Sequence, residues 1–166
     1  VENSFLEKFF VRLREYTNVF TEETSLLDVG CGSGNYTKAL ADKNIYLPGV
    51  LLKTSMVIAG DEATVSSTPT EVAQVTVKCL RESVPENIGG VVFLSGGQDE
   101  LHAAIHLSMI SDMVELPWSI TFSYGRAIQN DTLHIFAHDS SDIITAQEKL
   151  RYWASMNARA VRGELS

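Results

Sequence analysis

The chain has 166 residues, of which 45% are hydrophobic and 20% charged, and 21 acidic side chains against 13 Lys and Arg give a formal net charge of −8. This length is typical of one soluble domain or two small ones, and it allows a core that needs neither disulfides nor a structural metal. The acidic balance disfavours extended contact with nucleic acid or an anionic membrane, because both need clustered cations. No apolar run is long enough to span a bilayer or to act as a secretory signal. We therefore expect a cytoplasmic protein with no nucleic-acid or membrane partner.

The first 43 residues predict an N-terminal helix and then a Rossmann-like unit of strand, glycine loop and short helix. The strand is the apolar run at 25–29, which contains Asp28. It leads directly into the glycine loop, which carries Gly30, Gly32 and Gly34. We treat residues 1–43 as one unit and residues 44–166 as a second, or both as one continuous α/β domain.

From residue 44 onward, turn signals separate apolar runs from amphipathic stretches, a pattern typical of parallel βα units. The predicted strands are 49–57, 91–94 and 118–124. Helices are predicted from residue 68 to about 82, after the glycines at 96 and 97, and over 142–160, with an irregular or helical stretch around 133–137. The fold class is therefore α/β, built as an open parallel sheet or as an arc of a (β/α)8 (TIM) barrel. Ligand sites in either arrangement lie beyond the carboxyl ends of the strands.

Local signals define the start of one helix and the faces of two others. The sequence Thr68-Pro69-Thr70-Glu71 combines an N-cap, a proline at the first helical position and a carboxylate at the third. In the helix after Gly96 and Gly97, the residues expected to face inward are Leu101, Ala104, Ile105 and Met109. Histidines occur as two i,i+4 pairs on expected solvated faces, His102 with His106 and His134 with His138. Neither pair has a defined third ligand, so no metal site is predicted.

Three segments in order resemble class I fructose-bisphosphate aldolases. They are NIYLPGVLLKTSMV at 44–57, VPENIGGVVFLSGGQ at 84–98 and WSITFSYGRA at 118–127. The resemblance extends over about residues 44–163. It implies a TIM-barrel fold and a glycolytic lyase that cleaves or forms the C–C bond of a ketose bisphosphate through a lysine imine, without a cofactor.

Lys53 is a lone charge in a strand that otherwise has the composition of a buried one. Desolvation in that position would lower the pKa of the lysine and free its amine for attack on a carbonyl. From composition alone, a side chain that reaches solvent or pairs with Asp61 is the preferred explanation. The resemblance implies the catalytic role, because Lys53 aligns with the lysine that forms the imine in class I aldolases. Lys53-Thr54-Ser55 stands where the familiar run is lysine-proline-asparagine.

Two loops after consecutive predicted strands have the composition of a phosphate site, in which backbone N–H groups and a cation converge on the anion. The first loop contains Ser95, Gly96 and Gly97, and the second contains Ser123, Gly125 and Arg126. The resemblance implies that these six residues bind one phosphate of the substrate. Tight turns with a surface arginine are the alternative.

The segment LLDVGCGSG at 26–34 resembles the first motif of S-adenosylmethionine-dependent methyltransferases. That resemblance implies a cofactor site at Asp28, Gly30, Gly32 and Gly34. Such sites usually have a carboxylate at the end of the next strand, where this chain has Lys53-Thr54-Ser55. A strand-to-helix turn without ligand is therefore the favoured interpretation of the loop.

The remaining catalytic groups of class I aldolases come from strands that precede the imine-forming strand, and nothing in this chain matches them. A complete barrel also takes about 250 residues. We therefore expect imine formation with a phosphorylated sugar from this chain alone, rather than full turnover. The alternatives are an S-adenosylmethionine-binding methyltransferase module and a non-catalytic, chimeric or truncated α/β protein. Open sheet edges would favour a homo-oligomer.

Overall fold

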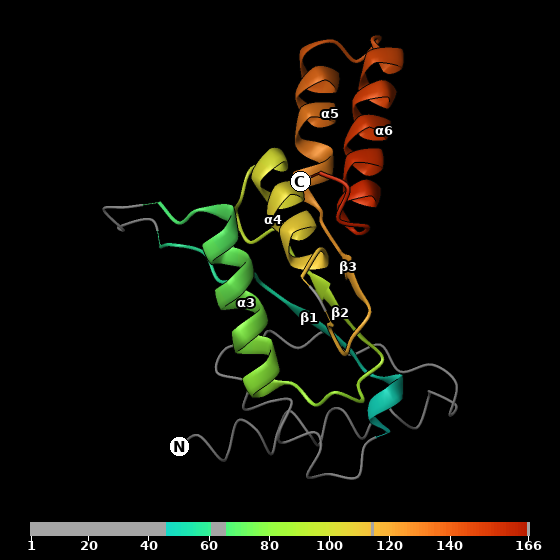
Figure 1. Cartoon of the computed structure of the whole chain (residues 1–166). Helices are drawn as coiled ribbons and strands as arrows, with labels where there is room; N and C mark the ends of the chain where they lie inside the picture. Colours follow the sequence, from blue (N-terminus) through green and yellow to red (C-terminus); the bar gives the residue numbers. More distant parts are fainter. Residues whose placement is uncertain (1–45, 61–65, 114, 166) are drawn as a thin grey trace, which may run out of the picture.

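The computed structural model describes residues 46–60, 66–113 and 115–165. The elements in chain order are the 3-10 helix η1 (Leu47–Gly49), β1 (Leu51–Thr54), α3 (Pro69–Ser83), β2 (Gly90–Phe93), α4 (Glu100–Ser111), β3 (Ile120–Phe122), α5 (Arg126–His138) and α6 (Ile143–Ala160) (Figure 1). The predicted N-terminal helix and the Rossmann-like unit with Asp28, Gly30, Gly32 and Gly34 lie outside the described residues. In the described ranges, no helix has both the length and the apolar character needed to cross a membrane.

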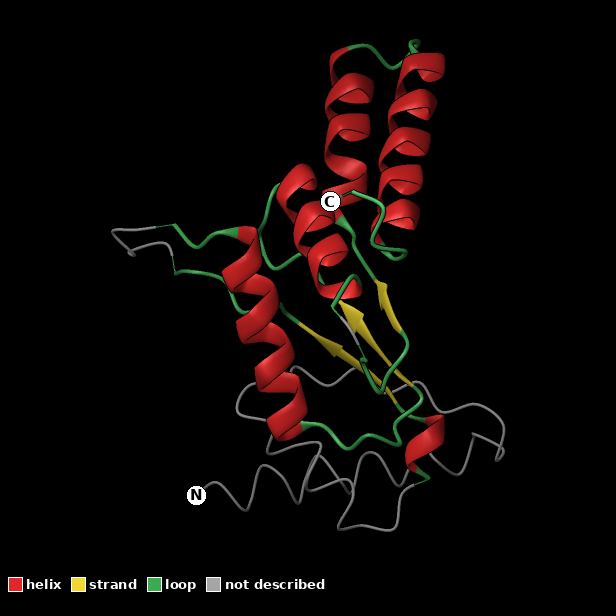
Figure 2. Cartoon of the chain, in the orientation of Figure 1, coloured by secondary structure: helices red, strands yellow, loops and turns green. Residues whose placement is uncertain are grey.

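The three strands form a parallel sheet in the order β1-β2-β3, which is also their order along the chain (Figure 2). Helix α3 connects β1 to β2, and α4 connects β2 to β3. Strands that follow one another in this way, each with a helix after it, are the repeating unit of a (β/α)8 barrel. The predicted α/β class and parallel βα units are therefore confirmed.

Helices α3 and α4 cover one face of the sheet (Figure 1). Leu52, Val91 and Phe93 point to this face and are fully buried in a common core with side chains of both helices. The members contributed by the helices include Val72, Val77, Leu80, Leu107 and Ile110. Lys53 pairs with Val92, and Val92 pairs with Thr121. Because strand side chains alternate between faces, these three residues point to the opposite face.

Two of the three strands are shorter than the apolar runs that predict them, whereas β2 is as long as its predicted run at 91–94 and begins one residue earlier. Within the run at 49–57 the strand is Leu51–Thr54. It begins only at Leu51 because Pro48 lies in the 3-10 helix η1 and Val50 is the C-cap of that helix. The run at 118–124 yields only Ile120–Phe122. Helix α5 is longer than the stretch predicted around 133–137, because it begins at Arg126, immediately after Gly125, and continues to His138.

The predicted inward face of α4 is partly wrong. Leu101 is 47% exposed, whereas the buried residues are Ala103, Ala104, His106, Leu107, Ser108 and Ile110. The helix contacts α3 on one side and α5 and α6 on the other, so small and polar residues are buried where helices meet. His106, predicted on a solvated face, is only 6% exposed.

The predicted start of α3 is confirmed in detail. The Thr68 hydroxyl accepts a hydrogen bond from the Glu71 N–H at 3.3 Å, and a Glu71 carboxylate oxygen accepts one from the Thr68 N–H at 2.8 Å. These two bonds satisfy backbone donors that the helix leaves unpaired. The Thr68 N–H and, next, the Thr68 hydroxyl both donate to the Glu71 carboxylate at 2.8 Å, and these two bonds lower the pKa of Glu71.

A close backbone approach before β2 gives a test of the fold. A methyl group on Gly89 would lie 2.5 Å from the carbonyl oxygen of Pro48 and 3.2 Å from that of Val50, which accepts the Gly89 N–H at 2.9 Å. We expect Gly89→Ala to lower the free energy of unfolding by about 1–3 kcal/mol, because the backbone must shift to relieve the clash. Urea unfolding followed by circular dichroism measures the change.

The matched control is Gly60→Ala, where the added methyl meets no atom of the described residues within 4 Å. Its effect should stay within about 0.5 kcal/mol, as is usual for surface substitutions. Equal unfolding midpoints for Gly89→Ala and the unchanged chain would contradict the close approach.

Candidate functional site

The predicted site residues of the aldolase-like region lie at the carboxyl ends of the three parallel strands. Lys53 is the third residue of β1, and the two predicted loops directly follow β2 and β3. Backbone bonds extend the ladder past the strand ends, from the Leu94 N–H to the Thr54 carbonyl at 2.9 Å and from the Ser123 N–H to the Phe93 carbonyl at 2.7 Å. The strand pairing therefore brings both loops to the carboxyl edge of the sheet, where Lys53 also lies.

Lys53 lies on the sheet face opposite α3 and α4. Its neighbours Leu52 and Thr54 are buried on the helix side, whereas Lys53 is half-buried. In a (β/α)8 barrel, helices cover the outside and the other face of the sheet lines the barrel interior. The alternation thus places the lysine on the interior face, near the end of the barrel where active sites form.

The first loop is a turn that passes beside the end of β1. Gly96 and Gly97 have φ values of 62° and 85°, a left-handed conformation that glycine adopts without strain. The Gln98 N–H closes the turn on the Ser95 carbonyl at 3.1 Å. A methyl group on Gly96 would come within 3.8 Å of the Ser55 side chain, so this loop borders the strand that carries Lys53.

The second loop leads directly into α5. The N-cap of α5 is Gly125, which has no side chain to cap the helix. The Gly125 carbonyl accepts the N–H groups of Ile128 and Gln129 at 3.1 and 3.2 Å. The amino end of a helix carries a partial positive charge and suits an anion. Ser123 and Arg126 are exposed here, and a guanidinium can bind two phosphate oxygens at once.

Helix α4 contacts both loops through side chains that the sequence reasoning did not assign to the site. Tyr124, between Ser123 and Gly125, donates its hydroxyl to the Ala103 carbonyl at 3.1 Å. Burial raises the pKa of this tyrosine. The Gln98 side chain donates to the Ser95 carbonyl at 2.9 Å and contacts His106. The sequence signal for these supports was only their adjacency to the loop residues.

The histidine pair on α4 is not arranged as a metal site. His102 is exposed and its Nδ1 lies 2.6 Å from an Asp99 carboxylate oxygen, whereas His106 is buried and bonds to Gln98. The two ring centroids are 6.0 Å apart. Among the residues the structure describes, no group of three or more His, Cys, Asp or Glu could hold a metal ion.

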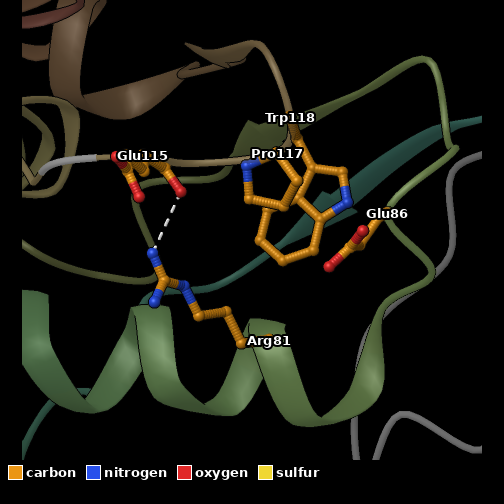
Figure 3. Close-up of a pocket in the computed structure, with 5 residues that line it drawn as sticks. All are labelled: Arg81, Glu86, Glu115, Pro117 and Trp118. Atoms are coloured by element: carbon orange, nitrogen blue, oxygen red, sulfur yellow. Dashed lines mark hydrogen bonds between the residues drawn. The ribbon is translucent and has the colours of Figure 1, made fainter.

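A hollow of about 270 Å³ occurs at the other end of the strands (Figure 3). Glu86 precedes β2 and Trp118 precedes β3, so this hollow lies at the amino ends. Arg81 points across it and donates to the Glu115 carbonyl at 3.0 Å. Trp118 is buried and donates its indole N–H to the Pro85 carbonyl at 2.8 Å. Residues at the amino ends of barrel strands generally serve stability rather than catalysis, so we do not assign the site to this hollow.

The fold corresponds to known proteins of one class, barrel-type aldolases. The family model "Fructose-bisphosphate aldolase class-I" matches residues 34–166. The chain is 43% identical to the muscle-type fructose-bisphosphate aldolase of Lethenteron camtschaticum and 44% identical to a fructose-bisphosphate aldolase of Drosophila melanogaster. Each match extends over 128 residues, which make up 76% of this chain and 35% of the relative. The chain therefore belongs to the class I fructose-bisphosphate aldolase family.

A solved aldolase from Plasmodium falciparum, crystallised with TRAP and a small-molecule inhibitor, superposes with a TM-score of 0.73 at 41% identity. The superposition covers 78% of this chain and 37% of that one. It confirms the predicted barrel-type fold for the described sheet and helices. The chain spans about a third of the length of the curated relatives it matches.

The glycine loop at 30–34 lies at the border of the matched region. The family match begins at Gly34, so Asp28, Gly30 and Gly32 precede it. The comparisons favour the aldolase interpretation over the methyltransferase one. Whether the loop is a ligand-free turn stays a prediction, as does the division of the chain at residue 43.

The bond between Tyr124 and Ala103 gives a test of how α4 holds the second loop. Tyr124→Phe should cost about 0.5–1.5 kcal/mol in the free energy of unfolding near pH 8, the usual contribution of one hydrogen bond. Because burial raises the pKa of Tyr124 in the folded chain, its contribution is present below the ordinary tyrosine pKa and is lost as pH rises above about 10. The difference between the two proteins should therefore shrink from pH 8 to pH 11 in urea unfolding. A constant difference would argue against the buried phenol.

Proposed function

We propose that the carboxyl edge of this sheet binds a ketose phosphate and that Lys53 forms an imine with its carbonyl carbon. One observation carries the proposal: the strand register brings Lys53, the glycine turn after β2 and the amino end of α5 to the same edge. Membership of the class I aldolase family supports the same assignment. Each of the three parts has the chemistry that one portion of such a substrate requires.

The lysine supplies the covalent step. The unprotonated amine of Lys53 attacks the ketone carbon, and loss of water from the resulting carbinolamine leaves an imine. The protonated imine then accepts, as an enamine, the electron pair released when the bond between its α and β carbons breaks, and in the reverse direction the enamine forms that bond. This electron sink is made from the chain's own lysine, so the proposed reaction uses no cofactor.

The two loops supply the phosphate site. Ser95, Gly96 and Gly97 offer a turn in which the backbone lies open to an anion, and Arg126 with the first turn of α5 offers positive charge. The chain carries a net charge of −8, so attraction of a phosphate must come from such local groups. Ser123 and Gly125 complete the second loop.

The complete reaction would be cleavage or formation of the C–C bond of fructose 1,6-bisphosphate, in glycolysis and in the cytoplasm. This reaction also needs a general base for the hydroxyl proton of the breaking bond. The described residues carry the imine and phosphate functions, and the full activity is proposed for the assembled barrel. Self-association through a sheet edge is proposed as one way to assemble it, since β1 and β3 are the outer strands of the described sheet.

Reductive trapping tests the imine directly. Borohydride added with dihydroxyacetone phosphate should reduce the imine to a stable secondary amine, leaving the three-carbon adduct on the peptide that contains Lys53. We expect Lys53→Met to abolish the adduct, with peptide mass spectrometry as the measurement.

Lys78→Met is the matched control, because Lys78 is an exposed lysine of α3, 4.0 Å from Glu82. That variant should label at Lys53 as the unchanged chain does. An adduct absent under saturating ketose phosphate, or spread equally over surface lysines, would refute the assignment of Lys53.

Removal of the arginine tests the phosphate site separately. Arg126→Ala should raise the dissociation constant for dihydroxyacetone phosphate about 10- to 100-fold, the loss expected for a charge-assisted contact. Isothermal titration calorimetry provides the measurement. Arg151→Ala removes an exposed arginine from α6 and should leave the dissociation constant unchanged. The same affinity in all three proteins would place the phosphate elsewhere.

A further inference from the structure

A chain of side-chain hydrogen bonds connects the core of α4 to the first loop. His106 Nδ1 lies 2.5 Å from the Gln98 side-chain oxygen, and the Gln98 side-chain nitrogen donates to the Ser95 carbonyl at 2.9 Å. The same carbonyl accepts the Gln98 backbone N–H at 3.1 Å. His106 and Ser95, at the two ends of this relay, are both buried, and Gln98 between them is half-buried.

The bonding pattern defines the protonation state of His106. Because the Gln98 amide nitrogen donates to Ser95, the amide oxygen must be the acceptor, and His106 Nδ1 must carry the proton. His106 Nε2 is buried and has no hydrogen-bond partner among the described residues. A second proton there would leave a charged donor unpaired. Burial, and next the charge of His102, lower the pKa of His106 against the opposing effect of Asp99.

The loop needs an external support of this kind. Gly96 and Gly97 are both left-handed, and glycine has more backbone freedom to lose on ordering than any other residue. Gln98 holds the start of the turn through two bonds to one carbonyl, and its side-chain nitrogen also lies 3.7 Å from the Met56 sulfur, just beyond β1. A turn fixed before the ligand arrives avoids the ordering cost at binding.

We propose that His106, acting through Gln98, is a positioning residue that holds the Ser95–Gly97 turn in the shape that binds phosphate. His106 does not touch the substrate in this proposal, which rests on the phosphate site proposed above. The competing explanation is that His106 fills space in the core of α4. The two explanations differ in whether the donor at Nδ1 matters.

A pair of substitutions separates these explanations. His106→Leu keeps a side chain of similar volume but makes it apolar, which removes the donor. His106→Asn keeps a donor nitrogen attached to Cγ, as in His106 Nδ1, but removes much of the volume. If His106 positions the turn, Leu disrupts the relay and Asn preserves it, whereas a space-filling role predicts the reverse.

Two measurements on the full chain read out the effect. Amide hydrogen exchange of the 94–99 segment should be faster in His106→Leu than in the unchanged chain and close to normal in His106→Asn. The dissociation constant for dihydroxyacetone phosphate should rise about 3- to 10-fold in His106→Leu, the loss of one hydrogen bond. Borohydride labelling of Lys53 at saturating ligand should stay the same, because only binding is affected.

Two further variants complete the design. His102→Leu, one turn earlier on α4 and exposed, is the matched control and should change neither measurement. Gln98→Met removes both side-chain bonds of the relay outside the helix core, so it tests the proposal even where His106→Leu fails to fold. It should reproduce the faster exchange and the weaker binding.

Normal exchange and normal affinity in Gln98→Met would overturn the proposal, as would a larger defect in His106→Asn than in His106→Leu. An unchanged chain that binds no dihydroxyacetone phosphate would instead overturn the proposed function. In that case the exchange rates alone would support the positioning role if they follow the donor at residue 106, and would overturn it if they do not.

Discussion

The register of the parallel strands is the constraint on which the site depends. Lys53 pairs with Val92, which in turn pairs with Thr121, and the rows on either side contain the buried residues Leu52, Val91 and Phe93. A slip of one residue in β1 would turn Lys53 into the core beneath α3 and α4 and bring Leu52 to the interior face. Burial of an ammonium in an apolar core is costly, so the core favours the register that turns Lys53 to the interior face.

Helix α4 converts this sheet into a site, because it holds the loops that follow both neighbouring strands. Its buried side includes a carbonyl that accepts from Tyr124 and an imidazole that bonds to Gln98. Ser108 on the same helix accepts the Leu165 N–H at 3.0 Å, which attaches the end of the chain. The helix is thus buried on several sides, and its polar groups link segments that are far apart in the sequence.

Local features of the sequence predicted the elements, and long-range packing decided the rest. The capping box at Thr68 and the proline beside it predicted the start of α3 to the residue, because both act within one helical turn.

The faces of the helices were less predictable. On α3, Val75 is 48% exposed while Thr76 is buried, where its hydroxyl accepts the Val57 N–H at 2.9 Å. His106 likewise bonds to Gln98, which lies in a loop eight residues earlier. The loop motifs predicted the site, whereas the groups that support it depend on tertiary contacts.

The same contacts limit which groups can take part in proton transfer. Tyr124 stands between two loop residues, but its hydroxyl is donated to a backbone carbonyl and burial raises its pKa, so it cannot act as a base near neutral pH. His106 is near the first loop, but its one proton is held by Gln98 and its other nitrogen is enclosed. Both titratable groups therefore serve the geometry of the loops. Imine formation at Lys53 and phosphate binding are the chemistry that we propose for this sheet edge, and the base that C–C cleavage needs would then approach Lys53 from the interior face, opposite α3 and α4.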